Sequence, residues 1–122
     1  MPPTIHHLAL RVADLERAAD FYGGLLGLAE VRRQGGEGGR LRAIWFELGA
    51  AVLMLELDLR GAGAAAGSAH VLALGVDALA PWERRLAAAG VAIDDRTEFT
   101  LFVRDPDGHR VGLSVHVFAR RS

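Results

Sequence analysis

A strand-like pattern that occurs twice constrains the fold of this chain most. Residues 6–12 and 70–76 both read His-x-Leu-x-Leu-x-Val, and the two copies start 64 positions apart. Alternation with period two predicts a β-strand that buries one face, and its recurrence indicates one structural unit used twice. The opposite face of this strand carries His7, Ala9 and Arg11 in the first copy, but Val71, Ala73 and Gly75 in the second.

Length and composition limit the classes of protein that need to be considered. With 122 residues, 51% of them apolar, the chain is long enough for one domain with its own core. The net charge of −1 and the scattered arginines predict neither a nucleic-acid nor a membrane partner. The chain has no cysteine, which excludes disulfides and thiolate metal sites. It shows no signal-peptide pattern or membrane span, so we expect a cytoplasmic protein.

Each half of the chain predicts the order β-α-β-β-β. In the first half Asp14 is placed to cap a helix, and in the second half Asp77 takes this place, with Pro81 in the first turn. A tight turn is expected at 105–108, Asp-Pro-Asp-Gly. The predicted strands are 4–12, 29–33, 41–48 and 51–58 in the first half, and 69–76, 91–95, 99–104 and 110–118 in the second.

These elements predict an α+β fold in a single domain, residues 1–122. Two βαβββ modules, about 4–58 and 69–118, are joined by a linker at about 59–68 that lacks large apolar side chains. One helix cannot cover both faces of a four-stranded sheet. We therefore expect the modules to combine into a curved mixed sheet around a cleft, with the helices outside.

Four motifs in this order resemble the vicinal oxygen chelate superfamily, which includes glyoxalase I, extradiol dioxygenases, fosfomycin resistance enzymes and bleomycin-binding proteins. The motifs are residues 7–15, Phe21-Tyr22, 26–28 and 102–108, and they extend over nearly the whole chain. The resemblance implies the cleft described above, a small-molecule ligand or substrate, and pairing of the chain into a homodimer.

Metal-dependent members of this superfamily carry a ligand on the first and the last strand of each module. By resemblance, His7 matches the first ligand and Glu56 the second. The positions of the third and fourth ligands are occupied by Val71 and Gly112, which cannot coordinate a metal. The resemblance therefore implies an incomplete metal site.

His70 precedes the third position by one residue, and it leaves two interpretations open. A shift of one residue places a side chain on the opposite face of a sheet, where His70 would be a partly exposed surface imidazole. A β-bulge near 68–71 would instead turn it inward, as a third ligand beside His7 and Glu56.

Other polar and aromatic side chains are predicted to face the cleft. Arg11 matches an arginine of glyoxalase I that binds a substrate carboxylate, although an ion pair with Glu56 or Asp58 explains it equally well. His7 and Glu56 are candidates for a metal-free acid–base pair, or for a structural hydrogen bond. The predicted ligand-binding residues are Arg11, Trp45, Asp58, Arg110, Ser114 and His116. For His116, which is near the end of the chain, the alternative interpretation is an imidazole exposed to solvent.

Three functions remain open from the sequence. The first is a binder of a small organic ligand with no cofactor, similar to the bleomycin-binding proteins. The second is a lyase, isomerase or dioxygenase of glyoxalase type that uses one divalent ion, such as Zn, Ni, Mn or Fe, held by His7, Glu56 and His70. The third is a metal-independent enzyme with His7 and Glu56 as acid and base.

Overall fold

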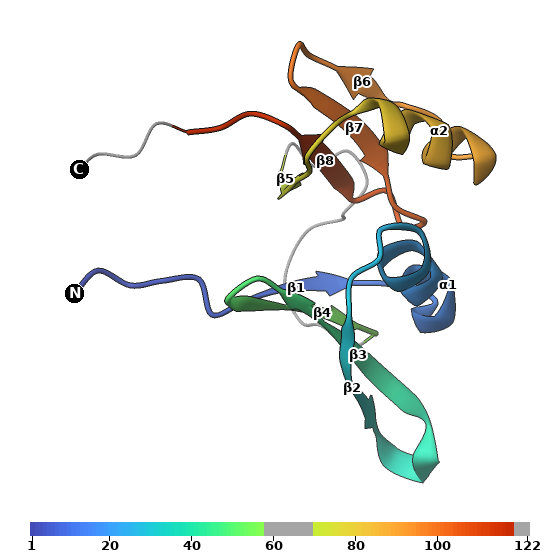
Figure 1. The fold of residues 1–122 in the computed structure, drawn as a ribbon. Helices are drawn as coiled ribbons and strands as arrows, with labels where there is room; N and C mark the ends of the chain where they lie inside the picture. The colour runs from blue at the N-terminus through green and yellow to red at the C-terminus, as the bar shows by residue number, and fades with distance from the viewer. Residues whose placement is uncertain (58–69, 119–122) are drawn as a thin grey trace. The chain divides into compact units, whose positions relative to one another are not determined.

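The computed structural model describes residues 1–57 and 70–118 of the chain, which form an α+β structure (Figure 1). The contacts within the chain divide it into two compact units, Met1–Ala65 and Ala66–Ser122. Each unit contains one four-stranded mixed sheet. The expected linker at 59–68 and Asp58 lie outside the described residues. No helix in the described part of the chain has the length and hydropathy needed to cross a bilayer.

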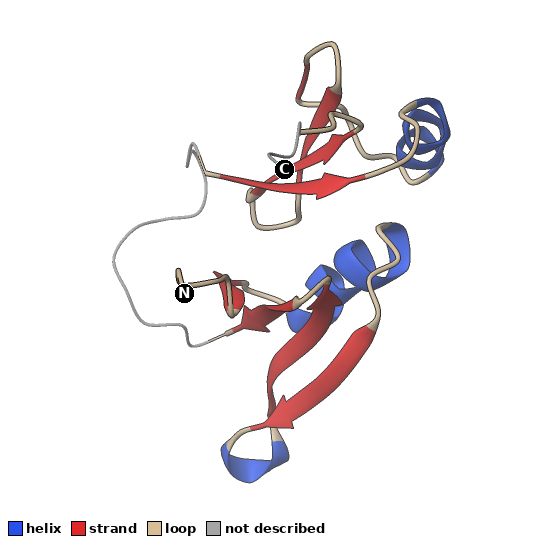
Figure 2. Cartoon of the chain, turned by 60° about the vertical axis from the view of Figure 1, so that its left-hand side comes forward, coloured by secondary structure: helices blue, strands red, loops and turns tan. Residues whose placement is uncertain are grey.

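The first unit has the predicted order β-α-β-β-β. Its sheet follows the order β1-β4-β3-β2, in which β1 is parallel to β4 and the other neighbours are antiparallel (Figure 2). The elements are β1 (His7–Arg11), α1 (Leu15–Ala19), η1 (Asp20–Leu25), β2 (Glu30–Gly35), the short 3-10 helix η2 (Glu37–Gly39), β3 (Leu41–Leu48) and β4 (Ala51–Glu56).

The helix of the first unit begins where the sequence predicts it. The side chain of Asp14 accepts a hydrogen bond from the backbone N–H of Arg17 at 3.1 Å, which satisfies a free amide of the first turn. The helix continues as the π-helical segment η1, and the chain then turns at Gly27, whose φ of +79° favours glycine.

One face of the first sheet forms the core of its unit. Leu53 and Leu55 of β4 pair with Phe46 and Ile44 of β3, and all four side chains are buried. The helix α1 packs against β3 and β4 and buries Leu15. Burial of this apolar area, at about 25 cal/mol per Å², is the main stabilising contribution in the unit.

An ion-pair cluster links α1 to the edge strand β2. Arg33 contacts the carboxylates of Glu30 and Glu16. The hydrogen bonds that Arg33 donates to the carboxylates of Glu30 and Glu16 raise the pKa of Arg33 further above its ordinary value, so the guanidinium stays charged.

The second unit repeats the order and the topology of the first. Its sheet follows the order β5-β8-β7-β6, and β5 is again parallel to the last strand. The buried face contains Leu101, Val103, Val111 and Leu113, and α2 contributes the buried Leu86. The elements are β5 (Val71–Gly75), α2 (Ala80–Ala88), β6 (Asp95–Arg96), β7 (Thr100–Arg104) and β8 (Arg110–Ser114).

Some local features of the second unit differ from the sequence prediction. Asp77 does not cap α2, because the helix begins later, with Leu79 at the cap position and Pro81 in its first turn. The strand expected at 91–95 is reduced to β6, and the strand expected at 110–118 ends at Ser114. His116 therefore lies beyond the sheet.

The turn between β7 and β8 has the predicted position and chemistry. The carboxylate of Asp105 is 4% exposed, and its Oδ1 accepts hydrogen bonds from the backbone N–H groups of Asp107 at 2.8 Å and His109 at 2.9 Å. The N–H of Gly108 closes the turn by donating to the carbonyl of Asp105 at 3.0 Å. The side chain of Asp105 thus provides an acceptor for backbone N–H groups of the turn, which have no partner on a neighbouring strand.

Candidate functional site: the open faces of the two sheets

Each sheet has a second face, opposite its buried leucines and valines, which we call the open face. In the first sheet, pairing between β1, β4 and β3 arranges the open face in three rows of side chains. The rows are His7–Val52–Glu47, Ala9–Met54–Trp45 and Arg11–Glu56–Ala43. Strand parity thus places His7, Arg11, Trp45 and Glu56 on one face, as predicted.

The open face of the second sheet has the same three-row arrangement on β5, β8 and β7. The rows are Val71–Arg110–Arg104, Ala73–Gly112–Phe102 and Gly75–Ser114–Thr100. Ala9 and Ala73 occupy equivalent places in the two copies of the repeated pattern. The register therefore makes Met54 of the first sheet equivalent to Gly112 of the second, and Glu56 equivalent to Ser114.

This register separates the two predicted metal ligands of the first module. His7 is level with Val52, whereas Glu56 is level with Arg11, four residues further along the parallel strands. At about 3.3 Å per residue, the two levels are about 13 Å apart. The structure therefore does not bring His7 and Glu56 together.

The imidazole of His7 lies beside that of its neighbour instead. The Nδ1 atoms of His6 and His7 are 2.9 Å apart, and the two rings meet edge to face. His70 is exposed and precedes β5, whose pairing with β8 is continuous from Val71 to Gly75.

Gly112 lies close to side chains of the two neighbouring strands. A Cβ atom at this position would lie 3.3 Å from Thr100 and 3.4 Å from both Phe102 and Val71. The space above the glycine is therefore occupied by its neighbours.

The described residues do not fit the metal site that the family implies. Of the four positions that the resemblance implies, Val71 and Gly112 have no side chain that coordinates a metal, and the other two, His7 and Glu56, lie four residues apart along parallel strands. Within residues 1–57 and 70–118, no group of three or more His, Asp or Glu side chains is placed to share an ion.

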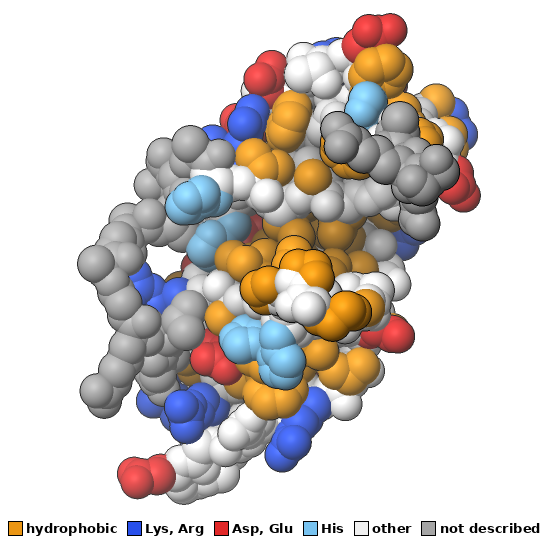
Figure 3. Space-filling model, turned by 90° about the vertical axis from the view of Figure 1, so that its left-hand side faces the viewer, with side chains coloured by type: hydrophobic (Ala, Val, Ile, Leu, Met, Phe, Trp, Pro, Cys, Tyr) orange, Lys and Arg blue, Asp and Glu red, His pale blue; other side chains and the backbone are white. Residues whose placement is uncertain are grey.

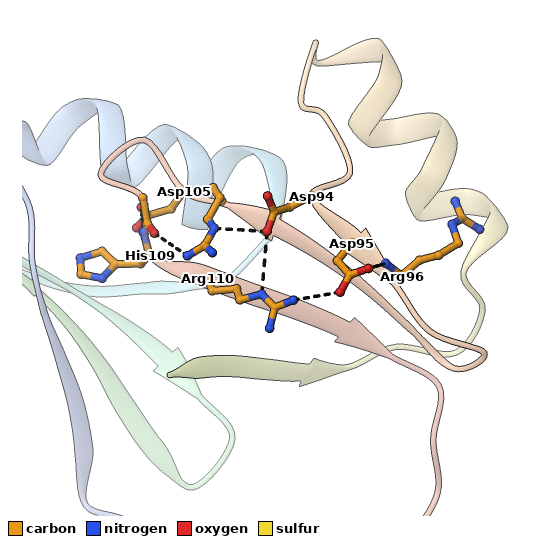
Figure 4. Close-up of polar contacts among 8 residues, drawn as sticks. Asp94, Asp95, Arg96, Asp105, His109 and Arg110 are labelled. Carbon is orange, nitrogen blue, oxygen red and sulfur yellow. Dashed lines mark hydrogen bonds and ion pairs between the residues drawn. The ribbon is translucent and has the colours of Figure 1, made fainter. Parts of the chain in front are cut away.

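The second open face carries a cluster of charged side chains (Figure 4). The guanidinium of Arg110 lies 4.1 Å from the centre of the Phe102 ring, with Nη2 3.3 Å from Asp95 and Nε 3.8 Å from Asp94. Arg104 contacts the same oxygen of Asp94 at 3.3 Å and donates to the carbonyl of Gly108 at 3.0 Å. Two arginines are thus held side by side, with Asp94 contacting both.

The other predicted ligand-binding residues lie in varied surroundings. The hydroxyl of Ser114 accepts a hydrogen bond from Thr100 at 2.8 Å. Trp45 is half-buried, and the guanidinium of Arg32 lies 5.4 Å from its ring centre. His116 is exposed beyond the end of β8, where its ring contacts Phe99 and Phe118. His116 therefore does not share the open face with Arg110 and Ser114.

Sequence reasoning missed several residues of the charged cluster. Phe102 and Arg104 have the parity of the open face in the alternating segment Thr-Leu-Phe-Val-Arg, so the pattern held a signal for them. Asp94 and Asp95 lie at a short strand whose pairing the sequence does not reveal.

Comparison with known proteins agrees with this fold. A family model described as Glyoxalase/Bleomycin resistance protein/Dioxygenase superfamily matches residues 4–113. A search of curated proteins gave no significant sequence match.

Solved structures resemble the chain over nearly its full length. Lactoylglutathione lyase from Agrobacterium tumefaciens is 22% identical, with a TM-score of 0.72 and 93% of each chain covered. The fosfomycin resistance protein FosX from Mesorhizobium loti is 19% identical, with a TM-score of 0.76 and coverage of 97% of this chain and 95% of that one. TnmS3, an antibiotic binding protein from Streptomyces sp. CB03234, is 26% identical, with a TM-score of 0.68 and coverage of 93% and 95%. Since the family model matches most of its residues, the chain belongs to the glyoxalase/bleomycin resistance protein/dioxygenase superfamily.

Proposed function

We propose that this protein binds a small organic ligand on the open faces of its sheets, without a metal ion. The observation that carries this proposal is the strand register. Two of the family's four ligand positions hold Val71 and Gly112, and the register separates the other two, His7 and Glu56, by four residues along parallel strands. An open coordination site for two substrate oxygens needs about three protein ligands, which these residues do not provide.

The likeness to TnmS3 supports binding rather than turnover. That protein is described as an antibiotic binding protein, and it is 26% identical to this chain, with 93% of this chain covered. The half-buried Trp45 supplies apolar contact area for an organic molecule on the open face of the first sheet, and Phe102 supplies it on the open face of the second.

The separation of His7 from Glu56 argues against the metal-independent enzyme. A general base must lie within hydrogen-bond reach of the proton that it abstracts, and the acid within reach of the atom that it protonates, on the same bound substrate. Side chains on strand levels about 13 Å apart are too distant to act on neighbouring atoms of one small substrate.

Elemental analysis of protein purified without chelator tests the metal-free part of the proposal. We expect less than about one tenth of a divalent ion per chain, and a melting temperature that neither EDTA nor added Zn²⁺, Ni²⁺ or Mn²⁺ changes. One bound ion per chain, or metal-restored turnover of the methylglyoxal–glutathione adduct, would contradict it.

A thermal-shift screen of drug-sized organic compounds tests the binding part. We expect hits that raise the melting temperature and change the fluorescence of Trp45, since ligands that bind only the folded state stabilise it. The variant Trp45→Phe, together with Trp82→Phe as a control on α2, identifies which tryptophan reports binding. A screen without any hit would count against the proposed function.

A further inference from the structure

The proposed function leaves the chemical class of the ligand open, and the charged cluster on the second sheet addresses it. Resting on that function, we propose that the ligand carries an oxyanion, such as a carboxylate or phosphonate, and that Arg110 binds it. The argument depends on how Arg110 is held and on which of its donors remain unused.

Arg110 is held in place by an aromatic ring and by two carboxylates. Its guanidinium lies 4.1 Å from the centre of the Phe102 ring, and its side chain is 22% exposed. Phe102 in turn lies against Gly112, where a Cβ would come within 3.4 Å of the ring. The glycine at the family's ligand position thus allows the ring to lie where it supports the arginine.

Most hydrogen-bonding capacity of Arg110 is unused. A guanidinium has five N–H donors in a planar fork. The structure shows one hydrogen bond, from Nη2 to Asp95 at 3.3 Å, while the buried Nε lies 3.8 Å from Asp94 without forming one. Nη1 has no hydrogen-bond partner among the described residues.

The ion-pair distances of Arg110 are longer than those of a strong charge-assisted hydrogen bond. Charge-assisted N–H···O bonds are commonly about 2.7–2.9 Å long, whereas the contacts of Arg110 here are 3.3 Å and 3.8 Å. The side chain of Asp95 is 61% exposed, so water screens its charge. The carboxylates orient the guanidinium (Figure 4), and the N–H groups of Nη1 and the second N–H of Nη2 are left for a planar or tetrahedral oxyanion.

Titration of the full chain with benzoate, phenylphosphonate and the neutral analogue benzamide tests this proposal by NMR. We expect both anions, but not benzamide, to shift the Nε–Hε resonance of Arg110, with binding that weakens as salt is added. Because the unmodified protein gives this readout, it does not depend on any variant folding.

Substitutions then test the role of the guanidinium. Arg110→Gln should weaken benzoate binding by about tenfold or more. The affinity of Arg110→Lys should lie between those of the wild type and Arg110→Gln, because lysine keeps the charge but lacks the planar pair of N–H donors. The matched control is Arg96→Gln, which removes an arginine of the same sheet whose guanidinium pairs with Glu83 instead, and it should bind as the wild type does.

The outcomes separate this proposal from the proposed function. If benzamide binds as tightly as benzoate, or if neither anion shifts the Arg110 resonance, the oxyanion assignment fails. Hits among neutral compounds in the thermal-shift screen would then still support ligand binding. If no compound of any class binds, both proposals fail.

Discussion

At the scale of single residues, two neighbouring glycines of η1 differ in what surrounds them. A Cβ on Gly23 would lie 2.9 Å from the buried ring of Phe46, whereas a Cβ on Gly24 would meet nothing within 4 Å. Gly23→Ala should therefore lower the free energy of unfolding by about 1–3 kcal/mol, through overpacking. Gly24→Ala should leave it unchanged or raise it by up to about 1 kcal/mol, because alanine favours helical backbone. Urea unfolding of both variants measures the difference, and equal stabilities would contradict this account.

The buried carboxylate of Asp105 allows a second test at this scale. Asp105→Ala removes the acceptor of two backbone N–H groups, from Asp107 and His109. Leaving them without that acceptor should cost about 1–3 kcal/mol of unfolding free energy. Asp105→Asn retains an oxygen in the same place and should recover part of the loss. A stability of the alanine variant equal to that of the wild type would show that the turn does not depend on this side chain.

At the scale of elements, the sequence predicted which face each residue occupies better than which residues are neighbours. Alternation in residues 6–12 placed His7 and Arg11 on one face correctly, because parity is a local property of a strand. The level of β1 against β4 depends on contacts between segments far apart in the chain. A shift of two residues between the strands keeps every side chain on the same face. The alternating pattern therefore could not show whether Val52, Met54 or Glu56 of β4 lies level with His7.

Helix and strand ends were predictable only where a local interaction determines them. Asp14 caps α1 as expected, because its side chain reaches the N–H of Arg17. Asp77 has the same position in the repeat, yet α2 begins after Leu79 and makes no side-chain cap. The β-branched and apolar residues before Asp94 favoured a longer strand than β6, which shows that pairing, not propensity, decides its extent.

The packing above Gly112 gives a prediction for strand β8. Gly112→Ala must displace Thr100, Phe102 or Val71 by a few tenths of an ångström, and we expect a loss of about 1–3 kcal/mol of unfolding free energy. Gly75→Ala on the neighbouring strand β5 is the matched control, since a Cβ there meets nothing within 4 Å. Gly112→Ala should also shift the NMR resonances of the Phe102 ring and of the Arg110 Nε–Hε group. Unchanged stability and unchanged resonances would show that the space above the glycine is open.

At the scale of the whole molecule, apolar side chains of the described residues are exposed at the surface (Figure 3). Val71 is 37% exposed and Phe99 43%, while Val117 and Phe118 are more than four-fifths exposed. In the two sheets, β1 and β5 are edge strands, with backbone groups available on one side. Small monomeric proteins seldom expose this many large apolar side chains to water.

Pairing of two copies would cover part of this surface, and we expect the protein to be a homodimer. Light scattering at micromolar concentration should give about twice the chain mass of 13.0 kDa. Since dissociation accompanies unfolding of a dimer, the urea midpoint should rise with protein concentration, by mass action. The double variant Val117→Ser/Phe118→Ser removes exposed apolar side chains that lie outside every strand, so it should not weaken the fold of a monomer. A mass of 13.0 kDa and a midpoint independent of concentration would contradict the dimer, whereas a dimer unchanged by the double variant would place its interface elsewhere on the chain.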